Sequence, residues 1–164
     1  MEEYKNLRNQ ITEAAGNVVY TYAAHWNIVN RLRARENFIK WLQIILTGLS
    51  TSGFLYTFGF NKSCWSWVPS LASAIALGLN LYVLHFNISE EIQKHRDAAN
   101  ALWDVREAYK ALIVDFEALE VEEIRSKRNE LTRAVSRINK IYPGTDEESF
   151  QKAQREIGKY IFEE

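Results

Sequence analysis

The chain has 164 residues, a formal net charge of −1, 47% hydrophobic residues and 25% charged residues. This near-neutral balance gives no case for binding nucleic acid through bulk charge. The one cysteine, Cys64, excludes an intramolecular disulfide framework and a cysteine-based zinc cluster. Only 2 Pro and 7 Gly are present, which argues against a loop-rich or all-β chain. We therefore expect an all-α protein.

The first part of the chain, residues 1–40, has the pattern of an amphipathic helix. It holds 6 Lys/Arg and 4 Asp/Glu, and its apolar residues recur at three- or four-residue spacing from Tyr4 to Leu32. This period predicts one long cytoplasmic helix over residues 3–36. Gly16 interrupts the pattern, but one glycine costs about 1 kcal/mol in a helix and does not end it.

Two uncharged stretches follow, at residues 41–60 and 64–88, joined by an outer turn at residues 61–63. Residues 41–86 carry a single charge, Lys62. A helix rises about 1.5 Å per residue, so each stretch can cross a hydrocarbon core about 30 Å thick. The alternative is a soluble bundle with two buried central helices, which the remaining residues would hardly cover. We therefore predict a two-helix transmembrane hairpin with long cytoplasmic helical extensions that form a helical bundle.

Basic residues close to the two predicted spans indicate the orientation of the hairpin. The outer turn offers only Lys62, whereas six basic residues flank the other ends of the spans: Arg31, Arg33, Arg35, Lys40, Lys94 and Arg96. This excess places both termini in the cytoplasm. The first 30 residues contain no apolar core, so we expect no cleavable signal peptide.

Each predicted span carries a stripe of polar residues that recur every seven positions. The first span has Gln43, Ser50 and Thr57, with Thr47 beside them, and the second has Ser66, Ser73 and Asn80, continuing to Asn87. Folding the hairpin matches the stripes level by level: Gln43 with Asn80, Ser50 with Ser73, and Thr57 with Ser66. Polar groups in a bilayer must face protein or water, so the stripes either join the two helices or line a pore in an oligomer. The residues alone favour a contact between the helices.

A neighbouring face of each predicted span carries small residues. On the second span these are Ser70, Ala74 and Gly78, and on the first they are Gly48 and Ser52. Small residues at four-residue spacing let helix backbones approach closely in lipid. We predict that this face packs against another transmembrane helix.

The last part of the chain, residues 89–164, holds 13 Lys/Arg and 17 Asp/Glu and is predicted to form cytoplasmic helices. Apolar residues at three-four spacing predict a helix that continues directly from the second span. They form a coiled-coil-like seam for contacts between copies in an oligomer: Leu102, Val105, Tyr109, Leu112, Phe116 and Leu119. We expect a bend near residues 119–122, a second helix over 124–142, a stop at 143–144, and a capping box at 145–148 that opens the last helix.

No set of residues in the sequence predicts catalysis, a metal site or a cofactor site. His25, His85 and His95 lie far apart in the sequence and lack the spacing of metal ligands. His25 lies one helical turn from Tyr22 and from Val29, so we expect a packed or interfacial imidazole there. We therefore do not expect an enzyme.

Several short strings, in a fixed order around the uncharged hairpin, resemble a known family. They are Tyr20-Thr21-Tyr22 with His25, Ala101 to Tyr109, Leu112 to Asp115, Arg128-Asn129-Glu130-Leu131, and Pro143-Gly144-Thr145. Together they resemble the SLATT family of two-transmembrane effector domains, which are associated with SMODS-type nucleotide synthases and SLOG sensors. The resemblance spans nearly the whole chain, as a single domain over residues 1–164.

The resemblance implies a multi-pass protein of the bacterial inner membrane that acts in anti-phage defence. Such an effector would be a pore-forming homo-oligomer, held inactive until a sensor or nucleotide-synthase partner signals infection. Opening the membrane would then arrest or kill the infected cell, as in abortive infection. With the family considered, pore lining and helix contact become equal interpretations of the polar stripes. The alternative function is a structural membrane adaptor whose cytoplasmic helices bind a defence or signalling partner.

Overall fold

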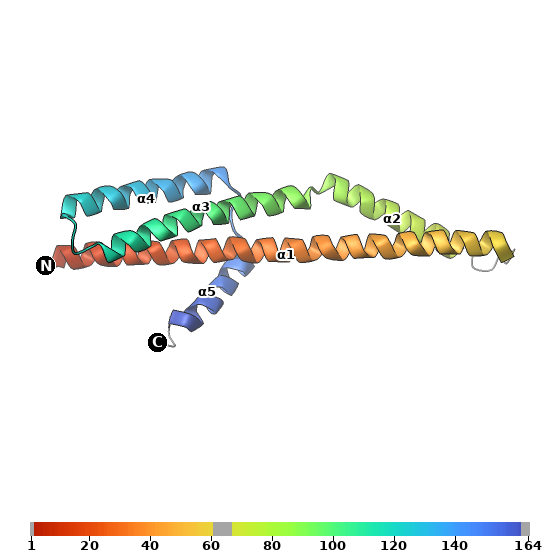
Figure 1. The fold of residues 1–164 in the computed structure, drawn as a ribbon, viewed down its shortest axis with the longest axis horizontal. Helices are drawn as coiled ribbons and strands as arrows, with labels where there is room; N and C mark the ends of the chain where they lie inside the picture. Colours follow the sequence, from red (N-terminus) through yellow and green to blue (C-terminus); the bar gives the residue numbers. More distant parts are fainter. Residues whose placement is uncertain (1, 61–66, 162–164) are drawn as a thin grey trace. The chain divides into compact units, whose positions relative to one another are not determined.

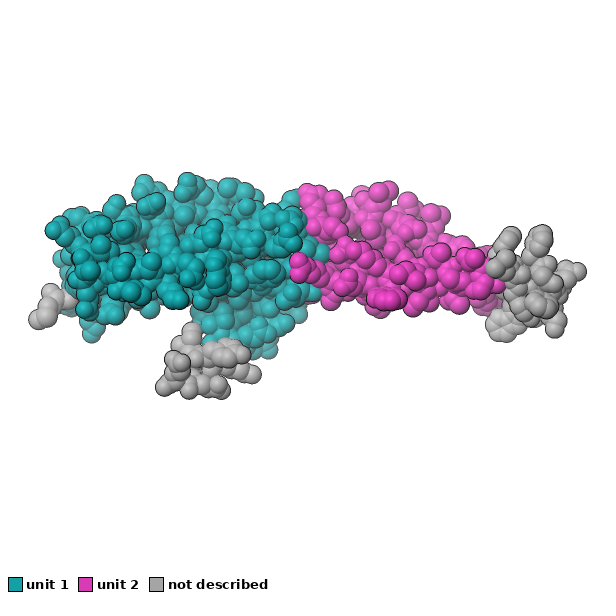
Figure 2. Space-filling view, viewed as in Figure 1, with its two compact units in different colours: residues 1–30, 92–164 teal, residues 31–91 magenta. Residues whose placement is uncertain are grey.

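The computed structural model describes residues 2–60 and 67–161, and it describes the side chains of residues 2–53 and 67–157. Within these residues every regular element is a helix, which confirms the all-α prediction. The helices are α1 (Glu2–Phe60), α2 (Trp67–His85), α3 (Ile88–Val114), α4 (Val121–Ile141) and α5 (Glu147–Ile161) (Figure 1). Two compact units are present: unit 1 comprises Met1–Asn30 with Ile92–Glu164, and unit 2 comprises Arg31–Glu91 (Figure 2).

Helix α1 is 59 residues long and joins the predicted amphipathic helix to the first predicted span without a break. The chain has no proline before Pro69, so every residue of α1 can supply a backbone N–H to the helical ladder. Buried side chains recur along α1 at intervals of seven residues: Ile11, Val18, His25, Leu32, Ile39 and Leu46. This spacing gives α1 one continuous contact stripe along its length.

The core of unit 1 lies between the first part of α1, α3 and α4. The predicted seam on α3 packs there, against Leu7, Ile11 and Val18 of α1 and Ile124 of α4. Tyr4 closes one end of this core, because its hydroxyl donates a 2.7 Å hydrogen bond to the carbonyl oxygen of Phe116. The spacing of the seam predicted contacts between copies. In the structure its residues find their apolar partners within one chain, so a second copy is not needed to cover them.

The boundary between α2 and α3 differs from the prediction of one continuous helix. Helix α2 ends at His85, and Asn87 precedes the first residue of α3. The backbone N–H of Glu90 points to Asn87 Oδ1 at 3.4 Å, and Asn87 Nδ2 donates to Glu90 Oε2 at 3.0 Å. Asparagine followed three residues later by glutamate is a helix-start signal, so Asn87 begins a new helix and does not extend the polar stripe.

The remaining helix ends agree with the predicted breaks. Helix α4 begins at Val121, which confirms the bend near residues 119–122, and it ends before Pro143-Gly144, which confirms the stop. The start of α5 differs in one detail. The backbone N–H of Ser149 donates to Asp146 Oδ1 at 2.9 Å, so the capping residue is Asp146, one position later than the predicted box.

Helix α5 packs on α1 within unit 1. Asn27 Nδ2 donates a 3.3 Å hydrogen bond to the carbonyl oxygen of Ser149, and the rings of Tyr20 and Phe150 lie 6.4 Å apart in an edge-on arrangement. Ala153, one turn further along α5, is fully buried. These contacts fix the first turns of α5 to the same helix that carries the core of unit 1.

Candidate functional site

Unit 2 contains a helical hairpin made by the second part of α1 and by α2. Its contact face on α1 includes Ile39 and Leu46, and Ala72 is the buried residue of α2. Gly53 of α1 lies directly against Pro69 of α2, because a Cβ added at Gly53 would collide with Pro69 Cγ and lie 3.1 Å from Pro69 Cβ. Gly53 therefore lets α1 approach the rigid ring of Pro69. The polar and small-residue patterns of the sequence gave no sign of this contact, although Gly53 lies seven residues after Leu46 in the contact stripe.

The structure joins one predicted pair of polar residues across the hairpin. Gln43 Nε2 donates a 2.7 Å hydrogen bond to Asn80 Oδ1, as the matched depth of the two residues predicted. The hydroxyl groups on α1 instead bond to their own helix: Ser50 Oγ donates to the Leu46 carbonyl and Thr47 Oγ1 to the Gln43 carbonyl, both at 2.8 Å. Self-bonded hydroxyls satisfy their hydrogen bonds without a partner helix.

The two members of the polar pair differ in exposure. Gln43 is half-buried on the contact face of α1, whereas Asn80 is exposed at the side of the hairpin, as is Ser73. The Gln43–Asn80 hydrogen bond can therefore join the two helices while the Asn80 amide still faces the surroundings of the hairpin. The other predicted members of the stripe, Thr57 and Ser66, lie outside the described side chains. That the stripe lines a pore stays a prediction.

The small residues predicted to pack against another helix are largely exposed. All five lie on the surface: Ser70, Ala74, Gly78, Gly48 and Ser52. A Cβ added at Gly78 or at Gly48 would meet nothing within 4 Å. The contact between α1 and α2 therefore does not depend on close approach at these two glycines. The packing of this face against another helix stays a prediction about a second chain.

Large apolar side chains cover the outside of unit 2. Among the described side chains, all but three of the exposed large hydrophobic residues belong to unit 2. Among the described residues, the range Trp67–Val114, which comprises α2 and α3, contains one segment that is long and apolar enough to cross a membrane, and only 6% of this segment is buried inside the chain. The first predicted span, residues 41–60, is helical but does not meet the same criterion among the described residues. A two-span hairpin in a membrane therefore stays a prediction.

Charged side chains tie α1 to α2 and to the start of α3 at the end of unit 2 that carries the predicted cytoplasmic flanks. Arg35 donates to the Tyr82 hydroxyl, and its guanidinium carbon lies 5.5 Å from the centre of the Tyr82 ring. Glu36 accepts a 2.8 Å hydrogen bond from Lys40 Nζ and a 2.7 Å hydrogen bond from Ser89 Oγ. These bonds, the one from Lys40 first, lower the pKa of the Glu36 carboxyl below its usual value. The sequence analysis used Arg35 and Lys40 only to orient the hairpin and did not predict these contacts.

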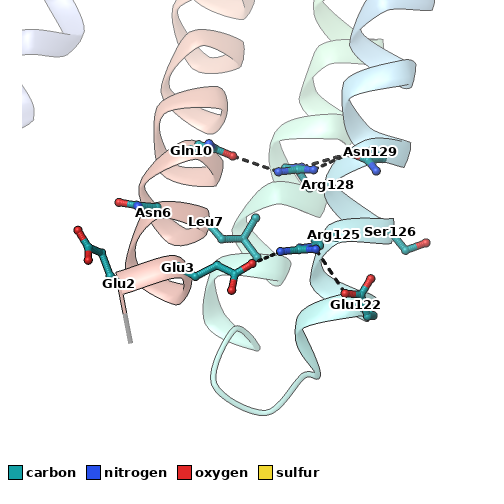
Figure 3. Close-up of a pocket in the computed structure, with 10 residues that line it drawn as sticks. All are labelled: Glu2, Glu3, Asn6, Leu7, Gln10, Glu122, Arg125, Ser126, Arg128 and Asn129. Atoms are coloured by element: carbon teal, nitrogen blue, oxygen red, sulfur yellow. Dashed lines mark hydrogen bonds and ion pairs between the residues drawn. The ribbon is translucent and has the colours of Figure 1, made fainter.

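A charged cleft of about 890 Å³ lies in unit 1 between the start of α1 and the start of α4 (Figure 3). Arg125 of α4 lies between two carboxylates, pairing with Glu3 of α1 and, at 3.4 Å, with Glu122. Arg128 Nη1 donates a 3.0 Å hydrogen bond to Gln10 Oε1 of α1. Both guanidinium groups are thus engaged within the chain, and the residues of the cleft join α4 to α1. Exposed pairs of this kind contribute about 1 kcal/mol or less.

Among the described residues, no group of three or more His, Cys, Asp or Glu side chains is placed to hold a metal ion. A family model described as "SMODS and SLOG-associating 2TM effector domain family 4", SLATT_4, matches residues 7–160. Comparison with curated proteins gave no match, and comparison with solved structures gave none either. The family match covers both units and agrees with the resemblance drawn from the sequence strings.

Proposed function

The chain belongs to the SMODS and SLOG-associating 2TM effector domain family 4, and we propose that it is a pore-forming effector of the bacterial inner membrane. Membership implies a two-transmembrane effector of anti-phage and conflict systems. In this proposal, several copies assemble through unit 2 and open on a signal from a sensor or nucleotide-synthase partner. The opened membrane then arrests or kills the infected cell.

The observation that carries the proposal is the exposed apolar surface of unit 2. Exposing a large apolar side chain to water costs about 1.5–3 kcal/mol relative to burying it. The side chains concerned include Trp41, Ile44, Leu77 and Leu81, each more than half exposed. A surface of this extent needs lipid or protein around it. The hairpin is bounded at one end by the charged contacts of Arg35 and Glu36, as expected at the edge of a bilayer.

Assembly of copies would use the small residues that the hairpin leaves uncovered. Lipid is as apolar as leucine, so helices in a membrane associate through close van der Waals packing and hydrogen bonds. The face of Ser70, Ala74 and Gly78 permits such packing against a second copy. In a ring of copies, the neighbouring Asn80 would face the centre and provide a polar lining, while Gln43 keeps it oriented.

The proposal places both termini and all of unit 1 in the cytoplasm. Arg31, Arg33, Arg35 and Lys40 on one side of the hairpin exceed the single Lys62 on the other. A cytoplasmic unit 1 would be the part of the chain that a sensor or nucleotide-synthase protein can reach. The continuous helix α1 would then carry the signal from unit 1 into the membrane.

Purified full-length chain in liposomes loaded with a self-quenched dye tests the proposal. The expected result is dye release that rises steeply with the ratio of protein to lipid, together with crosslinked oligomers of a defined size. A matched variant, in which residues 41–60 and 67–85 are replaced by leucine-alanine helices of equal length, should stay in the membrane and release no dye. Strictly monomeric protein without dye release, and without toxicity in cells, contradicts the proposal.

The same variant distinguishes the pore from a membrane adaptor. An adaptor needs its spans only as an anchor, so replacing them should preserve defence against phage in cells. The pore proposal expects the replacement to abolish defence while unit 1 remains folded. Preserved defence in the variant would favour the adaptor.

A further inference from the structure

Two histidines from distant parts of the sequence meet inside unit 1. His25 of α1 and His95 of α3 are each only 3% exposed. Their Nδ1 atoms lie 2.8 Å apart, within hydrogen-bond distance, and their ring centres are 5.1 Å apart. The packed imidazole predicted at His25 is confirmed. Its partner was not predicted, although His95 lies seven residues before Leu102 on the buried face of α3.

The buried side chains nearest to the pair along its own two helices are apolar. On α1 the buried neighbours of His25 are Ala24, Ile28 and Val29, and on α3 the buried neighbours of His95 are Ala98 and Ala99. The imidazole pair is a polar contact between α1 and α3 among these apolar side chains.

The contact between two Nδ1 atoms limits how many protons the pair can hold. A hydrogen bond between them needs a proton on one Nδ1 and a lone pair on the other. A first added proton is compatible with this arrangement, because the donor ring can carry it on Nε2. A second added proton places N–H groups on both Nδ1 atoms, which removes the acceptor and sets two positive charges against each other. This holds whichever ring takes the first proton.

We propose that the His25–His95 contact is an acid-sensitive lock between α1 and α3. The lock holds the two helices together while at least one of the facing Nδ1 atoms keeps its lone pair, and it releases them when both rings are protonated. The inference concerns unit 1 alone and does not rest on the proposed pore.

The surroundings of the pair agree with a contact that resists protonation. Burial, and then the adjacent His95, lower the pKa of His25 to about 4. Other titratable or charged groups lie near the two histidines along α1 and α3, or at the start of α5, which packs on α1. They are Tyr22 on α1, Glu91, Lys94, Arg96 and Asp97 on α3, and Asp146, Glu147 and Glu148 at the start of α5. The histidine variants described below leave all of these groups unchanged. An acid response that one of these groups causes would therefore persist in the variants, whereas a response that the histidine pair causes would be lost.

The direction of the response follows from this arrangement. At neutral pH His25 is uncharged and the lock is closed. As the pH falls toward 4, the second proton enters and α1 moves away from α3 near these residues. The hydrogen bond from Asn27 to the carbonyl of Ser149 lies two residues from His25, so release would also loosen the start of α5.

A distance measurement between spin labels tests the lock in the full-length chain in lipid nanodiscs. Asn30→Cys on α1 and Asn100→Cys on α3 provide exposed labelling sites in unit 1, in a Cys64→Ser background. We expect one narrow distance distribution at pH 7.5 and a longer, broader one at a pH of about 3.5, below the pKa of His25. The change should reverse when the pH is restored. An unchanged distribution at the acidic pH overturns the inference.

Two paired variants and one control show whether the histidines cause the change. His25→Leu with His95→Leu makes the contact apolar, and His25→Gln with His95→Gln keeps a hydrogen-bonding pair that cannot titrate. At least one of these double variants should keep the neutral distance and lose the response to acid. The exposed His85 serves as control, since His85→Gln should respond to acid like the native chain. An acid response as large in both double variants as in the native chain overturns the inference.

Discussion

Units 1 and 2 use the same kind of helix in opposite ways. Unit 1 buries Leu102, Ile124 and Tyr109 almost fully within the chain, whereas most of the large apolar side chains described in unit 2 are exposed. Among the described residues, unit 1 exposes few large apolar side chains, Trp103 and Val114 among them. A helix face must be covered by something, and in unit 1 that cover is α3 and α4. We therefore expect lipid or further copies of the chain to cover the exposed apolar side chains of unit 2.

The largest expected effect comes from breaking the core of unit 1. Leu102→Ala removes a fully buried side chain and should lower the free energy of unfolding of unit 1 by about 2–5 kcal/mol. Leu77→Ala, at a side chain of unit 2 that is 61% exposed, is the matched control and should leave unit 1 unchanged. Urea unfolding in mild detergent, followed by hydrogen exchange of α3 peptides, measures both. Equal effects of the two changes would remove the contrast between the units.

Acid should lower the free energy of unfolding of unit 1 more than that of unit 2, whose contacts are mainly apolar. The pKa of His25 is about 4 in the folded chain and 6.5 as its ordinary value. The unfolded chain therefore binds the proton first as the pH falls from 6.5 to 4, and stability is lost across this window. The shift corresponds to about 3 kcal/mol at most. Urea unfolding of unit 1 at several pH values measures the loss, and His25→Leu should flatten the curve across the same window.

A pair of glycine substitutions sharpens the account of the hairpin in unit 2. Gly53→Ala places a Cβ against the ring of Pro69 and should destabilise the contact of α1 with α2 by about 1–3 kcal/mol. Gly48→Ala meets nothing within 4 Å and should stabilise α1 by up to about 1 kcal/mol through helix propensity. Thermal unfolding in detergent micelles compares the two. The same sign for both changes would show that Gly53 is not a close contact.

Substitution at Gly78 separates contacts within the chain from contacts between copies. Gly78→Ile adds a branched side chain where the hairpin leaves open space, so the hairpin should keep its stability while crosslinked oligomers decrease. Leu77→Ile, at the preceding position, changes an already large side chain and is the control. Crosslinking in liposomes measures the oligomer fraction. Oligomer bands that match those of the native chain would place this face against lipid.

The helices of this chain could be predicted from the spacing of apolar residues, because a regular period of three and four residues leaves few alternatives. The stop followed from the helix-breaking residues Pro143-Gly144, and the bend near Val121 was placed where the apolar seam of α3 ends, at Leu119. The partner of the α3 seam could not be predicted. A seam of leucine, tyrosine and phenylalanine packs equally well on another copy or on the same chain, and only the fold shows that α1 lies beside it.

Some polar contacts of the fold could likewise be predicted from the sequence, and others could not. Gln43 and Asn80 could be paired because the hairpin geometry fixes their depths. The contact of His25 with His95 depends on the register of α1 against α3 over 70 residues of sequence, which no local pattern sets. The start of α3 just after Asn87 had a local signal, Asn87 followed by Glu90, but the seven-residue polar spacing favoured a place for Asn87 in the stripe.

The central claim, that the polar residue of α2 faces a water-filled path through an assembly of copies, is tested most directly by Asn80→Leu. Losing the bond to Gln43 should cost the hairpin about 1 kcal/mol or less. The account predicts that dye release from liposomes falls to background while crosslinked oligomers persist, because an apolar constriction dewets and blocks ions. Leu81→Ala, at the adjacent exposed position, should release dye normally. Normal release from normal Asn80→Leu oligomers would contradict the claim and leave the Gln43–Asn80 pair as a structural contact alone.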